Sequence, residues 1–233
     1  NADNKVAIAR AGGIAPLVAL VHEGTPDARC AAAVALWCIA NDNADSKIAI
    51  AGAGGIAPLV VLVHEGTPGA QQHAAGALWN IAFKNADSKV AIVRAGGIAP
   101  LVALLCDGTP DAQQQAAGAL AMIIVDDDRE IRADSKVAIV RAGGIAALVA
   151  LVRDGTPGAQ QHAVSALMIL IGDCEIPEGA YSWENGIVDH VVHAGGVAAL
   201  VGLAHDGTPD ARSSAAVVLR DLGSNDEHRA SMA

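Results

Sequence analysis

Eight histidines and four cysteines are the residues best suited to chemistry in this chain, because imidazoles and thiolates bind metals and transfer protons near neutral pH. Three of the histidines, His22, His64 and His205, stand two residues before a recurring Gly-Thr-Pro triplet, and His73 and His162 share a second recurring position. Copies of one position that are separated by a whole structural unit cannot converge on one ion. These histidines therefore predict surface copies of a repeat and no metal site.

The one local cluster is Asp189-His190-Val191-Val192-His193, with Cys174 and Glu175 in the segment before it. Two histidines at i and i+3 on a helix can share an ion, but this spacing alone is a weak signal. Ordinary polar surface is the favoured interpretation. We expect no metal and no cofactor.

The Gly-Gly and Gly-Thr-Pro sequences do not match a nucleotide-binding loop. A phosphate-binding loop requires GxxxxGK[ST] after a strand, a dinucleotide site requires GxGxxG between a strand and a helix, and the chain contains neither. With no other convergent set of reactive side chains, the sequence predicts a protein that is not an enzyme.

The glycine-containing motifs instead mark an internal repeat. Gly-Gly pairs begin at Gly12, Gly54, Gly96, Gly143 and Gly195, and Gly-Thr-Pro triplets begin at Gly24, Gly66, Gly108, Gly155 and Gly207, so both series step by 42, 42, 47 and 52 residues. Such periods indicate a solenoid whose units stack on one another. We expect one domain, 1–233, with units at about 1–42, 43–84, 85–131, 132–183 and 184–233.

Each unit predicts three helices, as the second unit illustrates. A short helix lies within Asn43–Gly54, and a buried one runs over Ile56–His64. Gly66 ends that helix, and Thr67-Pro68 begins a third helix that runs to about Phe83. Its core stripe consists of positions 70, 74, 77, 78 and 81.

The period, the order of the helices and the segments AGGIAPLVALV and GTPDA…AAGALWNIA closely resemble the armadillo repeat, over essentially the whole chain. The resemblance implies an all-α, right-handed α-solenoid of three-helix repeats. It also implies that the third helices line a concave groove for an extended peptide, with an Asn on each third helix bonding the peptide backbone and a Trp one turn earlier. The Asn position holds Asn80 but also Cys38, Met122, Ile169 and Asp221, and the Trp position holds Val34, Gly76, Gly118, Ser165 and Val217.

One face of the third helices gathers two of the three Trp residues, the only Phe and two of the three Met residues. It predicts an apolar groove with an acidic rim, whose contact residues are Trp37, Asp42, His73, Trp79, Asn80, Phe83, Met122, Asp126, Met168, Ile169 and Asp173. Equally compatible with the pattern is a packing role, in which these side chains fill the space between adjacent third helices.

The extra residues of the longer units fall in two insertions, Val125–Arg132 and Gly172–Gly186, between a third helix and the next first helix. The second insertion contains Tyr181 and Trp183 and is a candidate contact loop. Neutral growth of a loop, which costs little entropy, is the alternative.

Composition narrows the class of partner. The net charge of −10 and the absence of a basic stripe argue against nucleic acid, and no apolar run is long enough for a membrane span. The cysteines form no Cys-x-x-Cys pair, which favours a reducing compartment, the cytoplasm or the nucleus.

The sequence thus predicts a non-catalytic interaction scaffold that binds a protein or peptide carrying basic and apolar residues. The alternative is a structural element that associates with itself through uncapped ends, since Val6, Ile8 and Leu17 of the first unit match interior positions of the other units.

Overall fold

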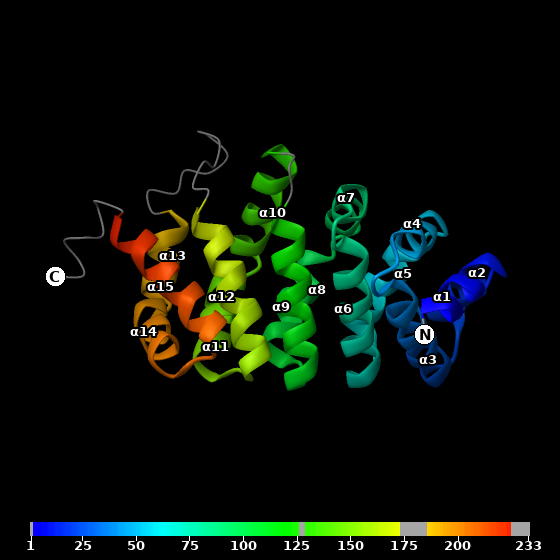
Figure 1. Ribbon diagram of the computed structural model, residues 1–233, viewed down its shortest axis with the longest axis horizontal. Helices are drawn as coiled ribbons and strands as arrows, with labels where there is room; N and C mark the ends of the chain where they lie inside the picture. The colour runs from blue at the N-terminus through cyan, green and yellow to red at the C-terminus, as the bar shows by residue number, and fades with distance from the viewer. Residues whose placement is uncertain (1, 126–128, 173–185, 225–233) are drawn as a thin grey trace.

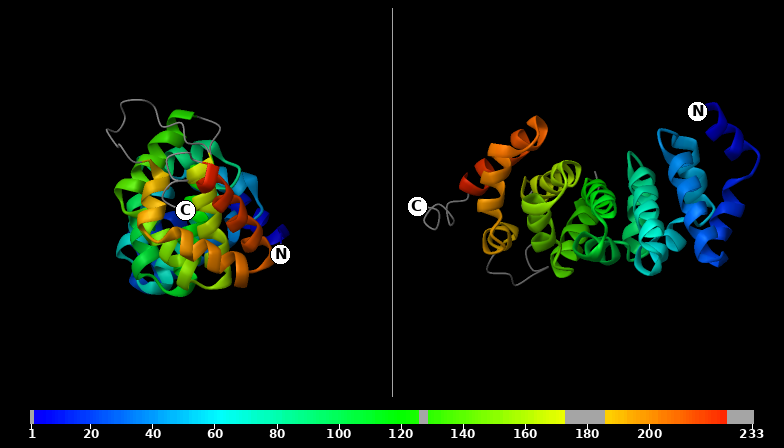
Figure 2. Two further views of the ribbon diagram at one scale, coloured as in Figure 1. Left: turned by 90° about the vertical axis from the view of Figure 1, so that its left-hand side faces the viewer. Right: turned by 90° about the horizontal axis from the view of Figure 1, so that it is seen from below.

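The computed structural model describes residues 2–125, 129–172 and 186–224. Within these ranges the chain forms fifteen helices and no strand. The helices stand in an elongated row, with the N-terminal helices at one end and the C-terminal helices at the other (Figures 1 and 2). The predicted all-α solenoid is confirmed.

The helices follow one another as successive triads, each with a first, a second and a third helix. The first helices are α1 (Ala2–Arg10), α4 (Ala44–Gly52), α7 (Ala86–Arg94), α10 (Arg129–Arg141) and α13 (Ile187–His193). The second helices are α2 (Ile14–Glu23), α5 (Ile56–Glu65), α8 (Ile98–Asp107), α11 (Gly144–Asp154) and α14 (Gly196–Asp206). The third helices are α3 (Pro26–Ala40), α6 (Pro68–Ala82), α9 (Pro110–Ile124), α12 (Pro157–Gly172) and α15 (Pro209–Ser224). Third helices pack on third helices and second helices on second helices along the row, so both layers are continuous.

The Gly-Gly pair bends the chain between the first and second helices. In the third triad Gly96 has φ 73°, a left-handed conformation that glycine adopts without strain, and the N–H of Gly97 donates to the carbonyl of Ile92. This is a Schellman-type helix end, and it sets α7 and α8 at 80° to each other.

The Gly-Thr-Pro triplet joins the second helix to the third. The N–H of Ala70 donates to Thr67 Oγ1, which is the predicted N-cap, and Pro68 occupies the first turn. Gly66 is required for space rather than for a left-handed φ, because a Cβ there would lie 2.4 Å from the carbonyl oxygen of Leu62. Gln71 Nε2 then donates to the carbonyl of Val63 at the end of α5, and the equivalent residues Arg29, Gln113, Gln160 and Arg212 make the same bond in the other triads.

The core is a seam of alanine, leucine, isoleucine and valine that runs the length of the row. All five residues of the predicted third-helix stripe of α6 are buried, namely Ala70, Ala74, Ala77, Leu78 and Ile81. Small alanine side chains let the third helices approach closely, which brings residues two triads apart within reach of each other.

A ladder of lysines closes the ends of the third helices, a feature that the sequence analysis did not identify. Lys5, Lys47 and Lys136 donate from Nζ to the carbonyls of Asn41, Phe83 and Leu170, and Lys89 donates to the carbonyl of Val125. A cation at a helix C-terminus satisfies unpaired carbonyls and favours the helix dipole. The fifth triad has Val188 at this position.

The structure corrects the interpretation of the first insertion. Val125–Arg132 was expected to be a loop, yet α10 begins at Arg129, so the second half of the insertion lengthens a helix. The segment Arg129–Arg132 consists of residues with favourable or neutral helix propensity, and Ser135 Oγ donates to the carbonyl of Ile131 within the extended helix. Asp126, Asp173, Tyr181 and Trp183 lie outside the described residues.

No single helix in the described ranges is long and apolar enough to cross a membrane. The five first-and-second helix pairs reach sufficient length and apolar character when each pair is counted together, but each is bent by 74° to 83°.

Candidate interaction groove on the third helices

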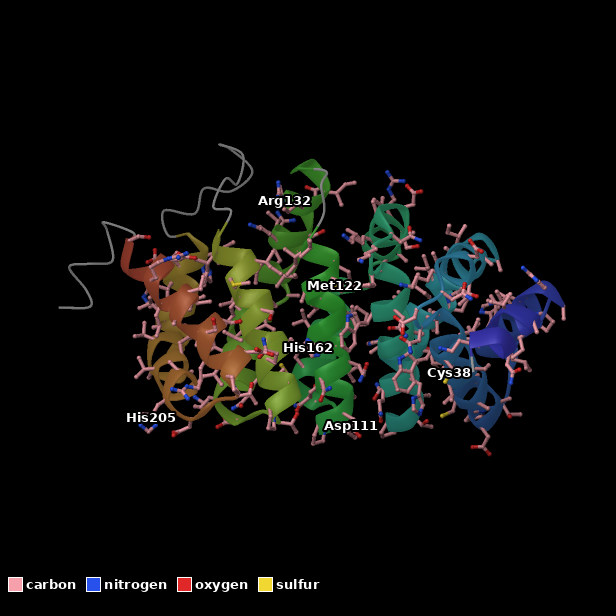
Figure 3. The ribbon with its side chains drawn as sticks, in the orientation of Figure 1. Cys38, Asp111, Met122, Arg132, His162 and His205 are labelled. Carbon is pink, nitrogen blue, oxygen red and sulfur yellow. The ribbon has the colours of Figure 1, made fainter. Side chains whose placement is uncertain are left out.

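An open groove of about 610 Å³ lies along the third helices α3, α6, α9 and α12. Seven of the predicted contact residues line it: Trp37, Asp42, Trp79, Asn80, Phe83, Met122 and Ile169. Its walls are completed by Cys38, Asn41, Gln115, Ala121, His162 and Ser165. Figure 3 shows Cys38, Met122 and His162 spread along this row of helices.

The indole of Trp79 forms the centre of the groove wall. A Cβ added to Gly118 would lie 2.8 Å from Cδ2 of Trp79, so the indole rests on the bare backbone of α9. Beyond Gly118 its ring meets the ring of His162 on α12, with centroids 4.6 Å apart and an interplanar angle of 75°. An edge-to-face contact of this kind is favourable between aromatic rings. A side chain on α6 thus crosses α9 and contacts α12.

Trp37 packs on the equivalent glycine one triad earlier, but its imidazole partner lies on the adjacent third helix α6. A Cβ on Gly76 would lie 3.0 Å from Nε1 of Trp37, and the indole stacks on His73 with centroids 5.4 Å apart. Trp37 and Trp79 are both half-buried and packed against the core, and both line the groove. The same face therefore serves for packing between helices and for presenting aromatic surface.

The next triad breaks the pattern at Ala121, which takes the place of Trp37 and Trp79 in α9. On α12, the position equivalent to Gly76 and Gly118, the two glycines on which the indoles rest, holds Ser165. Ala121 and Ser165 line the groove with Trp79, Met122 and His162, so a third indole is missing where the groove reaches α12. We call this part of the groove the Ala121 gap.

Asn80 holds its place through a main-chain contact. Its Nδ2 donates to the carbonyl of Trp37 at 3.1 Å. A side-chain amide has two N–H donors and one acceptor, and this bond uses one donor.

The rim of the groove carries both charges. Asp42 and Lys84 occupy equivalent positions after α3 and α6, with φ of 55° and 57°. Lys47 Nζ and Lys84 Nζ lie 4.8 Å and 5.3 Å from the centroid of the exposed Phe83 ring, within the range of cation–π attraction. Of the acidic rim that the sequence predicts, only Asp42 belongs to the described residues.

Two further predicted contacts contribute less directly. Met168 is partly buried against the core and does not line the groove. His73 supports the indole of Trp37 from beneath, and its Nδ1 is buried without a hydrogen-bond partner.

Burial lowers the pKa of both His73 and His162 from the ordinary value of 6.5. Below pH 6.5 the unfolded chain therefore binds a proton at these positions more readily than the folded chain does. This difference in proton binding does not change the free energy of unfolding above pH 6.5. It lowers the free energy of unfolding as the pH falls below 6.5.

We expect the melting temperature to decrease between about pH 7.5 and about pH 5.5, and His162→Gln to reduce that loss. Glutamine is the residue that α9 carries at the equivalent position, Gln115, so the replacement fits the row. Thermal melts followed by circular dichroism at both pH values measure the effect, with His64→Gln, which removes an exposed imidazole from α5, as the matched control. A variant H162Q that keeps the full loss would contradict the assignment.

A metal centre finds no support in the described ranges, where no group of three or more His, Cys, Asp or Glu side chains could hold an ion. His190 Nδ1 and His193 Nδ1 instead lie within hydrogen-bonding distance of the carbonyls of Gly186 and Asp189. Cys30, Cys38 and Cys106 are free thiols.

A family model, the Armadillo/beta-catenin-like repeat, matches residues 1–40, 43–83 and 85–122. Among solved structures, an engineered protein is 32% identical over 96% of this chain and 85% of its own, with a TM-score of 0.79. A designed armadillo repeat protein in complex with the peptide (KR)4 is 24% identical over 95% of this chain and 87% of its own, with a TM-score of 0.77. The armadillo repeats only protein from Plasmodium falciparum is 18% identical over 95% of this chain and 98% of its own, with a TM-score of 0.73. No curated protein matches this chain in sequence.

Proposed function

This chain belongs to the armadillo repeat family, and from that premise we propose that its third-helix groove binds an extended segment of another protein that carries basic and apolar side chains. The observation that supports the proposal best is the pair of half-buried indoles, Trp37 and Trp79, that line an open groove together with the apolar side chains of Met122 and Ile169. Concave surfaces with aromatic anchors are where binding energy concentrates in protein interfaces.

The chemistry of the walls defines the segment. The faces of Trp37 and Trp79 favour the guanidinium of Arg or the ammonium of Lys, an attraction of about 0.5–2 kcal/mol per contact. Asp42 adds a carboxylate at the rim, and the net charge of −10 attracts a basic ligand over longer distances. The Ala121 gap, bounded by Met122 and Ile169 as well as Trp79, suits an aliphatic side chain.

The similar designed armadillo repeat protein holds the peptide (KR)4, which makes that peptide the first probe. We expect fluorescently labelled (KR)4 to bind saturably in an anisotropy titration. A peptide of the same length with leucine in place of each arginine should bind with a weaker dependence on salt, because salt screens only the charged contacts. The acidic peptide with Asp and Glu in place of Lys and Arg is the control for charge. Equal binding of all three, or of none, would overturn the proposal.

Met122→Trp tests whether the ligand enters the gap. Met122 lines the groove beside Ala121 and is only partly buried, so an indole there would occupy open groove volume, and we expect it to weaken binding of the leucine-containing peptide about tenfold, close to 1.4 kcal/mol. Ala103→Trp, at an exposed position of the second helix α8, is the matched control. An unchanged affinity of M122W would place the ligand elsewhere on the molecule.

A further inference from the structure

His162 reaches the central indole of the groove from two triads away. It belongs to α12 and lines the groove, and its ring meets the ring of Trp79, on α6, edge to face with centroids 4.6 Å apart. α9 lies between these two helices and leaves room for the contact at Gly118, where an added Cβ would lie 2.8 Å from the indole. His162 is thus an aromatic neighbour that orients the Trp79 indole in the groove wall.

The indole one triad earlier has an uncharged partner at the corresponding position. Nε1 of Trp37 and Oε1 of Gln115 each lie 3.0 Å from a Cβ built on Gly76. Gln115 stands two triads after Trp37, as His162 stands two triads after Trp79. An amide does not titrate near neutral pH, whereas an imidazole does. At this position, therefore, the neighbour of Trp79 can acquire a charge and the neighbour of Trp37 cannot.

The surroundings of His162 keep its ring neutral near neutral pH. α12 packs on α9, α11, α13 and α15, and burial, with no contribution from a neighbouring charge, lowers the pKa of His162. The charged or titratable side chains on those four helices are Asp111, Arg153, Asp154, Asp189, His190, His193, Asp210, Arg212, Arg220 and Asp221. Figure 3 shows Asp111 at the lower end of α9, below His162. Arg153 and Arg220 pair with the aspartate that follows each of them, and Arg212 donates to the carbonyl of Ala204.

Two other titratable side chains line the groove, Cys38 and Asp42. His73 stacks on Trp37 but does not line the groove. Among the described residues, His162 is therefore the side chain whose protonation places a new positive charge in the groove wall.

We infer, on the basis of the proposed function, that His162 is a positioning residue of the groove: its neutral imidazole orients the Trp79 indole for a basic segment, and protonation of the imidazole releases that segment. The imidazolium lies in the groove wall, where it repels the Lys and Arg side chains of the ligand. It is also attracted to the indole of Trp79, for which those side chains compete. The groove therefore holds a basic segment at neutral pH and releases it in acid.

Anisotropy titrations of labelled (KR)4 at about pH 7.5 and about pH 5.0 test this inference, because Lys and Arg stay protonated at both and only the protein titrates. Salt at about 0.15 M screens charges that lie farther apart than about 8 Å, so distant histidines contribute little. We expect the wild-type chain to bind at least about threefold more weakly at the lower pH, within the limit of about tenfold per pH unit that one titrating group sets. Circular dichroism at the lower pH confirms that the chain remains folded.

Four variants assign the effect to His162. His162→Phe keeps a ring against Trp79 that cannot be protonated, so it should bind (KR)4 equally tightly at the two pH values. His162→Gln, which copies Gln115, should bind more weakly than H162F at the higher pH, because it loses the ring contact, and should show no further loss in acid. His64→Gln removes an exposed imidazole from α5 and is the matched control, and Asp42→Asn accounts for the carboxylate of the groove. H64Q and D42N should both lose the same factor in acid as the wild-type chain.

An NMR titration of the His162 ring adds a readout that a purely structural role would not change. By linkage, a ligand that binds the neutral ring more tightly lowers the pKa of His162, so the ring should titrate at a lower pH when (KR)4 is bound. Failure of (KR)4 to bind at the higher pH would overturn the proposed function and this inference together. Binding at the higher pH that is equally tight in acid, or that H162F and the wild-type chain lose by the same factor, would overturn this inference alone. A pKa of His162 that (KR)4 leaves unchanged would do the same.

Discussion

Trp79→Ala is expected to weaken binding of (KR)4 by roughly 30- to 100-fold, or about 2–3 kcal/mol. Trp79 forms the centre of the groove wall: its indole rests on Gly118 and meets His162. Truncation removes the largest aromatic surface between α6 and α12, and it also frees His162 from the contact that orients its ring. A loss of this size is typical of a tryptophan at the centre of an interface.

The same variant separates the two roles of this face. If Trp79 mainly presents a surface, W79A keeps its helical circular dichroism signal and melts close to the wild-type temperature. If Trp79 mainly fills space between helices, the melting temperature decreases and binding decreases only in proportion to the unfolded fraction. Trp79→Phe is the matched control, because it keeps an aromatic face over Gly118 and should recover most of the affinity. If W79A binds (KR)4 as tightly as the wild-type chain does, the indole is not part of the binding surface.

Gly97→Ala is expected to cost about 2–3 kcal/mol of stability, the range of an overpacked core site. The added Cβ would lie 2.7 Å from Cγ2 of Ile92, 3.0 Å from the carbonyl oxygen of Ile92 and 3.2 Å from Cγ2 of Val60. Ile92 is fully buried, so it has little room to move, and Val60 belongs to the preceding triad. The substitution therefore disturbs both the bend between α7 and α8 and the contact between the second and third triads.

The matched control is Gly52→Ala, the same chemical change at the end of α4. A Cβ on Gly52 meets nothing within 4 Å, and alanine is the better helix former by up to about 1 kcal/mol. We expect G52A to be neutral or stabilising, whereas G97A should melt roughly 5–10 °C below the wild-type chain. Thermal and urea unfolding of both variants measure the difference. If G97A and G52A were equally stable, neighbouring triads would not be in close contact at Gly97.

The sequence by itself determined the units, the helices and their ends. Gly-Gly and Gly-Thr-Pro act locally, through a left-handed residue, a helix cap and a proline at the first turn, so their effect does not depend on what lies far along the chain. The stripe of Ala70, Ala74, Ala77, Leu78 and Ile81 was predicted for the same reason, since the helical period alone defines one buried face.

Only the tertiary structure decided how the groove is built, because its walls depend on side chains from neighbouring triads meeting across a distance. The contact of Trp79 with His162 requires α9 to offer no side chain at Gly118, and the lysine ladder requires each first helix to reach the end of its third helix. The sequence holds one signal of the tryptophan contact. In the unit after Trp37 and in the unit after Trp79, the facing position is a glycine, Gly76 and Gly118, whereas in the unit after Ala121 it is Ser165. The extension of α10 into the first insertion was missed because its helical segment follows an acidic run whose local pattern is that of a loop, whereas stacking against α8, α9 and α11 stabilises the helix.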